Sequence, residues 1–164
     1  MGVLKNLVKT DADTAHSNIA TLIEVGLHSS HALTGAIVVT NQAKNTVLLR
    51  ETESYHSEGY HVEQGLLAKL FDFSKSNGGP FKLPANSRVY LYVYNSPCSQ
   101  CVGKLSFALR VAPWGSKNPT VTWKLGFTKL YLQPERRDGY ASAADARDDY
   151  NARLAVAGWQ WKQI

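Results

Sequence analysis

The residues of this chain with the clearest chemical potential are one histidine, one glutamate and its two cysteines. His61 and Glu63 are separated by one residue, and Cys98 and Cys101 by two. An imidazole and two thiolates can bind Zn²⁺ and leave a fourth tetrahedral position open, which is the arrangement of a catalytic zinc. Water in that position becomes acidic enough to react near neutral pH. A carboxylate two residues from the histidine can then move protons without binding the metal itself.

The order of the two motifs makes this interpretation more specific. A His-x-Glu followed by Pro-Cys-x-x-Cys is the pattern of zinc deaminases of nucleobases, although each half alone is common. We therefore predict that His61, Cys98 and Cys101 bind zinc and that Glu63 shuttles protons. The alternatives for the cysteines are a redox pair of the thioredoxin type or two buried thiols. His56 and Glu58 form a competing His-x-Glu, but the apolar spacing of a helix begins only after Glu63, which favours His61.

The elements that must position these residues alternate between helix and strand, as judged from the period of the apolar residues. Such alternation predicts an α/β fold whose later strands run parallel. No internal repeat or linker is evident, so a single domain over residues 1–164 is the simplest organisation. We expect a helix over 11–28, a strand over 35–40 with a hairpin partner over 46–50, a helix from 61 to about 74, a strand over 88–94, a helix from about 98, a loop over 113–119, a strand over 121–132, a helix over 141–157 and a strand over 159–164.

Composition limits the class of protein without deciding its substrate. With 164 residues, 44% hydrophobic and 19% charged, the chain can form one compact core and is not expected to be disordered. A net charge of +5 is compatible with a nucleic-acid partner but does not require one. No apolar run is long enough to span a bilayer, and the N-terminus lacks a signal-peptide core. We expect no membrane partner, a soluble monomer, and a cytoplasmic or nuclear location in preference to secretion.

From about Gly35 to Ile164 the sequence resembles the AID/APOBEC-like branch of the cytidine deaminase superfamily, which includes small bacterial and secreted animal proteins. The resemblance rests on the His-x-Glu run over 59–67, on the strand over 90–101 that leads into Ser-Pro-Cys-x-x-Cys, and on the segments 128–131 and 154–159. It implies a three-layer α/β/α fold with a five-stranded mixed sheet, an antiparallel first hairpin and parallel last strands. It also implies hydrolysis of cytosine to uracil, in many members within single-stranded DNA or RNA. Asn95 stands where many members have Trp.

The resemblance also suggests residues that contact substrate. By position, Ser96 lies at the pocket floor, Tyr131 walls the target base, and the segment 132–137 meets the neighbouring nucleotide.

Basic and aromatic residues near the predicted recognition loop suit contacts with a polynucleotide. Arg136 and Arg137 lie between Tyr131 and Tyr140, a mixture that suits phosphate contact and base stacking. The alternative is a solvated turn, because acidic residues flank both arginines. Trp114, in a Pro-Trp-Gly run, is the tryptophan we expect to contact substrate. Trp159 and Trp161 are expected to be packing residues.

Three functions remain open from the sequence. The leading hypothesis is zinc-dependent deamination of cytosine in single-stranded DNA, or in RNA, in which zinc-activated water attacks C4 and Glu63 transfers the protons. The second is a metabolic deaminase of free cytidine or a related base, which predicts activity on mononucleosides. The third is a zinc-stabilised nucleic-acid-binding module without turnover. Such a module has no need of a carboxylate at Glu63, so that residue counts against it.

Overall fold

The computed structural model describes residues 35–43, 46–53 and 61–163. The predicted helix over 11–28 lies outside the described residues. His56 and Glu58 of the competing motif also lie outside them. The elements are β1 (Gly35–Thr40), β2 (Val47–Glu53), α3 (Val62–Lys75), β3 (Arg88–Asn95), α4 (Ser99–Arg110), α5 (Pro113–Lys117), β4 (Thr122–Lys129), α6 (Ala143–Asp149), a π-helical turn η1 (Tyr150–Ala155) and β5 (Trp159–Gln163).

The strands form one five-stranded mixed sheet in the order β2-β1-β3-β4-β5. Strand β1 runs antiparallel to both of its neighbours, whereas β3, β4 and β5 are mutually parallel. These findings confirm the predicted α/β fold with an antiparallel first hairpin and parallel last strands. Because β1 is the single reversed strand, β2, β3, β4 and β5 all end at the same edge of the sheet. Loops that follow parallel strands therefore converge at this edge, which is where open α/β sheets place their ligands.

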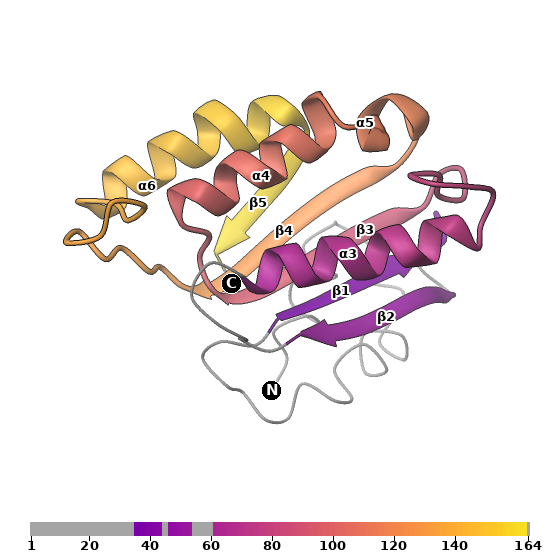
Figure 1. The fold of residues 1–164 in the computed structure, drawn as a ribbon, viewed down its shortest axis with the longest axis horizontal. Coiled ribbons are helices and arrows are strands. Elements are labelled where there is room, and N and C mark those ends of the chain that lie inside the picture. The colour runs from indigo at the N-terminus through magenta and orange to yellow at the C-terminus, as the bar shows by residue number, and fades with distance from the viewer. Residues whose placement is uncertain (1–34, 44–45, 54–60, 164) are drawn as a thin grey trace.

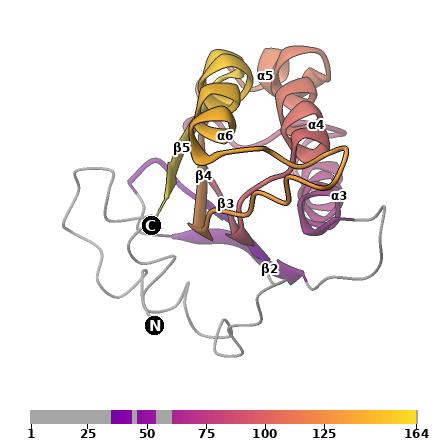
Figure 2. The same ribbon diagram turned by 90° about the vertical axis from the view of Figure 1, so that its left-hand side faces the viewer.

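The described helices lie together on one face of the sheet (Figures 1 and 2). Two successive crossovers, β3–α4–β4 and β4–α6–β5, step in the same direction across the sheet, and right-handed crossovers then place both helices on the same side. Alternate residues of the central strands face these helices and form the core, among them Leu91, Leu125 and Phe127, all fully buried. Within the described part of the chain, no helix combines the length and apolar character needed to cross a membrane.

The larger differences from the sequence-based predictions, beyond shifts of one or two residues at element ends, each have a local reason. Strand β2 continues to Glu53, because residues 50–52 are exposed on an edge strand, where no apolar alternation is needed. The predicted loop over 113–119 contains the short helix α5, which begins with Pro113 and is too short for a helical period. Strand β4 ends at Lys129, because the next residues turn away to form a loop. The predicted helix over 141–157 is α-helical from Ala143 to Asp149, widens into η1 and returns to an α-helix at residues 156–157.

Candidate metal centre

Two helix N-termini meet at the edge where the strands end. His61 is the N-cap of α3, and its backbone N–H donates to Gln64 Oε1 at 3.0 Å. Cys98 is the N-cap of α4, and its sulfur accepts the backbone N–H of Cys101 at 3.4 Å. The absence of a side chain at Gly35 permits the approach of α3, because a Cβ there would lie 2.6 Å from Val62 Cγ1. The positive ends of two helix dipoles thus favour anionic ligands at this place.

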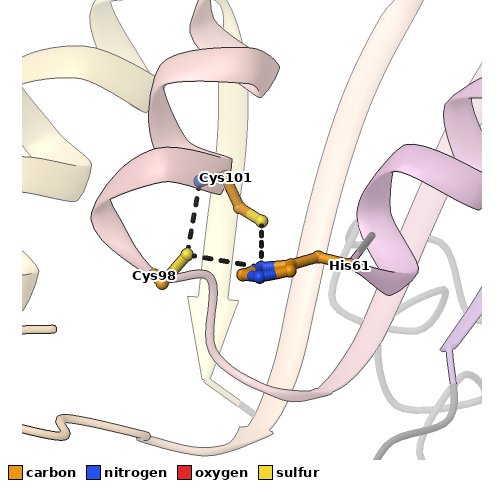
Figure 3. A group of neighbouring side chains, drawn as sticks. All are labelled: His61, Cys98 and Cys101. Atoms are coloured by element: carbon orange, nitrogen blue, oxygen red, sulfur yellow. Dashed lines mark hydrogen bonds between the residues drawn. The ribbon is translucent and has the colours of Figure 1, made fainter. Parts of the chain in front are cut away.

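The three predicted ligands converge, as Figure 3 shows. His61 Nδ1 lies 3.0 Å from Cys101 Sγ and 3.5 Å from Cys98 Sγ. One ligand atom from each residue can be chosen so that all three lie within 4.8 Å of one another. No other cluster of three metal-ligating side chains occurs among the residues that the structure describes. The sequence prediction of a His–Cys–Cys group is therefore confirmed at the level of geometry.

The donor set fits a zinc ion. Tetrahedral zinc with its usual bond lengths to nitrogen and sulfur sets the ligand atoms about 3.5–3.8 Å apart. The separation of 3.5 Å between His61 Nδ1 and Cys98 Sγ matches that range, and the separation of 3.0 Å to Cys101 Sγ is about half an ångström shorter. Zn²⁺ prefers thiolate and imidazole ligands, whereas Mg²⁺ and Ca²⁺ prefer oxygen. A soft or borderline divalent cation is the ion that this group can hold, with a fourth position left for another ligand.

Glu63 lies beside this group and not within it. Its side chain is 6% exposed, and Cys101 Sγ donates to Glu63 Oε2 at 3.4 Å. Burial raises the pKa of Glu63, while its own backbone N–H, the thiol of Cys101 and the nearby positive charges of His61 and Lys104 oppose that rise. A buried carboxyl with a raised pKa at the border of a metal site is suited to accepting and returning a proton.

The two cysteines differ in acidity. The hydrogen bond with Cys101 lowers the pKa of Cys98 to about 6, and the Cys101 backbone N–H and His61 act in the same direction. The pKa of Cys101 is raised by its hydrogen bond with Cys98, by burial and by the nearby Glu63. A metal ion binds cysteine as the thiolate, so binding at this group should release the proton that the pair still holds.

The turn that carries Cys98 is joined to the segment after β4. Ser96 N–H donates to Lys129 O at 2.8 Å, and Ser96 Oγ accepts the backbone N–H of Tyr131 at 2.8 Å. Ser96 is only 3% exposed. Two of the predicted substrate-contacting residues, Ser96 and Tyr131, are therefore neighbours beside the candidate metal centre, and the serine fixes the backbone position of the tyrosine.

The predicted recognition loop closes on itself before α6. The backbone N–H of Tyr140 donates to Leu132 O at 2.6 Å, and a Cβ at Gly139 would lie 1.8 Å from Gln133 O, so this close return requires glycine. Arg136 and Arg137 are exposed at its tip. The base of the loop is joined to the metal-binding turn, because Ser99 N–H donates to Asp138 O at 2.9 Å.

Trp114 does not belong to the site. It is 4% exposed and packs edge-on against Phe81 and Trp123, with ring centroids 5.0 and 6.0 Å away. It lies in α5, which follows the C-terminal end of α4, whereas the ligands lie at the N-terminal end of that helix. The expectation that Trp114 contacts substrate is therefore corrected: it is a core residue. Trp159 is 1% exposed and Trp161 packs against the core, as predicted for both.

Residues of the last helix, which the sequence pattern did not single out, support the metal-binding turn. Tyr150 donates to Pro97 O at 2.8 Å, and Arg153 donates to Ser99 O at 3.1 Å. Asp149 accepts from Arg153 Nε at 2.6 Å. The i,i+4 spacing of Asp149 and Arg153 was a visible signal of a helical ion pair. Their approach to residues more than fifty positions away had no local signal.

No protein-family model matches the chain, and no curated protein matches its sequence. The assignment of this site therefore rests on its geometry and on the chemistry of its residues.

Proposed function

We propose that this chain is a zinc-dependent hydrolase that converts cytosine to uracil in single-stranded DNA. The observation that carries the proposal is the buried carboxyl of Glu63 at 3.4 Å from Cys101 Sγ, beside a His61–Cys98–Cys101 group that can hold a metal ion. A structural zinc site uses four protein ligands and has no need of a buried carboxyl at its border, whereas hydrolysis needs an open position and a proton carrier.

In the proposed reaction, three residues bind the metal and Glu63 transfers protons. Zinc held by His61, Cys98 and Cys101 would supply a Lewis acid that acidifies a water molecule. Glu63 accepts a proton from that water and delivers it to the ring nitrogen next to C4. It then assists the second proton transfer, to the exocyclic nitrogen, which leaves as ammonia. The net reaction adds water to cytosine and releases uracil and ammonia, without an oxidant or reductant.

Support for a polynucleotide substrate comes from the loop over 132–139. Its exposed arginines are carried on a closed turn whose base is hydrogen-bonded to Ser99, directly after the ligand Cys98. A base that reaches the metal centre from a single strand brings its flanking phosphates with it. We propose that Arg136 and Arg137 contact such phosphates; in the protein alone, Arg136 contacts Asp138 at 4.0 Å and Gln133 at 3.2 Å.

The experiment that tests the function compares three substrates with the zinc-loaded protein: a single-stranded DNA oligonucleotide containing one cytosine, the matching RNA, and free cytidine. We expect uracil in the DNA, detected by uracil excision and strand cleavage, and none with a Glu63→Gln variant. Product from RNA alone or from free cytidine alone would overturn the DNA assignment. Absence of product from all three would overturn deamination of cytosine.

The loop arginines give a second prediction. We expect Arg136→Ala/Arg137→Ala to weaken oligonucleotide binding and to reduce the slope of log K against log salt by about 1.4, the value for two lost phosphate contacts on a single strand. Fluorescence anisotropy at several salt concentrations measures both quantities. Arg110→Ala/Lys117→Ala is the matched control, because it removes the same charge from exposed residues toward the other end of α4 and in α5. If both double variants lost the same oligonucleotide affinity and the same salt dependence, the loop would have no specific role in binding and would be a solvated turn.

A further inference from the structure

The backbone on both sides of Cys98 is held by side chains of the last helix. Before the cysteine, Tyr150 donates its hydroxyl proton to Pro97 O at 2.8 Å. After it, one nitrogen of Arg153 donates to Ser99 O at 3.1 Å and to Ser99 Oγ at 3.0 Å. Cys98 itself lies between these two anchored peptides. The position of this ligand therefore depends on η1, an element more than fifty residues away in sequence.

Both anchoring side chains are themselves fixed. Tyr150 is fully buried, with its ring packed edge-on against Phe127 and Tyr140. Arg153 is held by Asp149, which accepts from its Nε at 2.6 Å and also pairs with its terminal nitrogen. The hydroxyl of Tyr140 donates to the same carboxylate. A guanidinium oriented by a carboxylate in this way loses little further side-chain entropy when it binds a second partner.

The π-helical turn is what makes this arrangement unusual. The chain forms a regular helix up to Asp149 and then widens over Tyr150–Ala155. Turns of this kind are rare and occur frequently at functional sites. Here the widened turn contains both donors that hold the backbone around Cys98: Tyr150 reaches Pro97, and Arg153 reaches Ser99 in the first turn of α4. Arg153 also lies close to Gly103 of α4, where an added Cβ would lie 3.4 Å from a guanidinium nitrogen.

We propose that Tyr150 and Arg153 are positioning residues of the metal centre, which hold Cys98 and the first turn of α4 in the geometry that binds the ion. This inference rests on the metal site of the proposed function. Residues that orient metal ligands from outside the ligand set commonly change metal affinity by about 10–100-fold when they are removed. In this protein they act on the backbone of the ligand-bearing turn, since neither residue touches a ligand side chain in the contacts described above.

The test measures metal binding directly, without an activity assay. Zinc affinity is determined by competition with a chromophoric chelator for the wild type, Arg153→Ala and Tyr150→Phe. The visible absorption spectrum of the Co²⁺-loaded proteins reports the ligand geometry. We expect each variant to bind zinc about 10–100-fold more weakly and to show altered Co²⁺ bands. The matched control is Arg147→Ala, which lies on α6 and donates to Gln163 Oε1 at 3.1 Å, away from the metal-binding turn. It should leave both readings unchanged.

The outcomes separate this inference from the proposed function. A wild-type protein that binds no zinc would refute the metal site itself. If the wild type binds zinc tightly and both variants show the same zinc affinity and Co²⁺ bands as the wild type, the positioning role is refuted. The metal site itself would then still stand. Tyr150→Phe keeps the buried ring, so it decides the question if Arg153→Ala does not fold. Its unchanged affinity and spectrum would then overturn the proposal.

Discussion

Replacement of Glu63 by glutamine should reduce uracil formation by at least about 10²–10⁴-fold, the usual contribution of a positioned general acid–base group. Glutamine keeps the size of the side chain but cannot accept a proton from water. Zinc content should stay the same, because Glu63 lies outside the His61–Cys98–Cys101 group. The measurement is single-turnover deamination of the DNA oligonucleotide, beside metal analysis of the same samples.

The Glu63 variant also separates the two His-x-Glu motifs. Glu58→Gln is its matched control, because Glu58 has the same relation to His56 as Glu63 has to His61. We expect Glu58→Gln to remain active. If instead Glu63→Gln were fully active and Glu58→Gln inactive, the proton carrier would belong to the upstream motif and the assignment of Glu63 would be wrong.

Replacement of Cys98 by alanine should remove the metal and much of the stability together. A ligand bound only by the folded state, at a free concentration a thousand times its dissociation constant, stabilises that state by about 4 kcal/mol. For a chain of this length that corresponds to a loss on the order of 10 °C in thermal midpoint. The expected result is a zinc-free protein with a lowered midpoint, measured by metal analysis and by thermal unfolding with added zinc.

Chelation supplies the internal control for the Cys98 variant. A strong chelator should lower the midpoint of the wild type almost to that of Cys98→Ala and leave the variant unchanged. The remaining difference in thermal midpoint between the chelated wild type and Cys98→Ala would measure the N-cap hydrogen bond from Cys101 N–H to Cys98 Sγ. The variant lacks this hydrogen bond as well as the metal. A Cys98→Ala protein that kept both its zinc and its midpoint would show that Cys98 is not a ligand.

The residues most accessible to sequence reasoning were those whose signal is local. Short spacing placed Cys98 and Cys101 on one helical turn, and the start of the apolar period after Glu63 placed His61 at a helix N-terminus. Strand β1 was predicted with the bounds it has, because a run of β-branched and aliphatic residues bordered by polar ones is a strand signal at any position. Strand β5 and its two packing tryptophans followed from the same kind of pattern.

Predictions failed where a residue's environment is built from distant segments. Trp114 was expected to lie in a loop and contact substrate, but it packs against Phe81, which precedes α4 in the chain, and against Trp123 of β4. The π-helical turn was also not predicted. Over so few residues, the spacing of apolar residues in a π-helix cannot be distinguished from that in an α-helix. Its geometry is tied to the contacts that Tyr150 and Arg153 make with the turn around Cys98.

The sequence alone thus determined the chemical elements of the site: an imidazole, two thiols and a carboxyl, each at the start of a helix, and an α/β fold able to bring those helix starts to one edge. Residue type and short spacing are properties of the chain itself, so they can be read without a structure. Only the tertiary structure decided that His61 Nδ1 reaches both sulfurs, that Glu63 is buried beside them, and that the last helix holds the backbone around Cys98. Those distances depend on how β3, α3 and η1 pack, and packing is set by many long-range contacts at once, which no local pattern encodes.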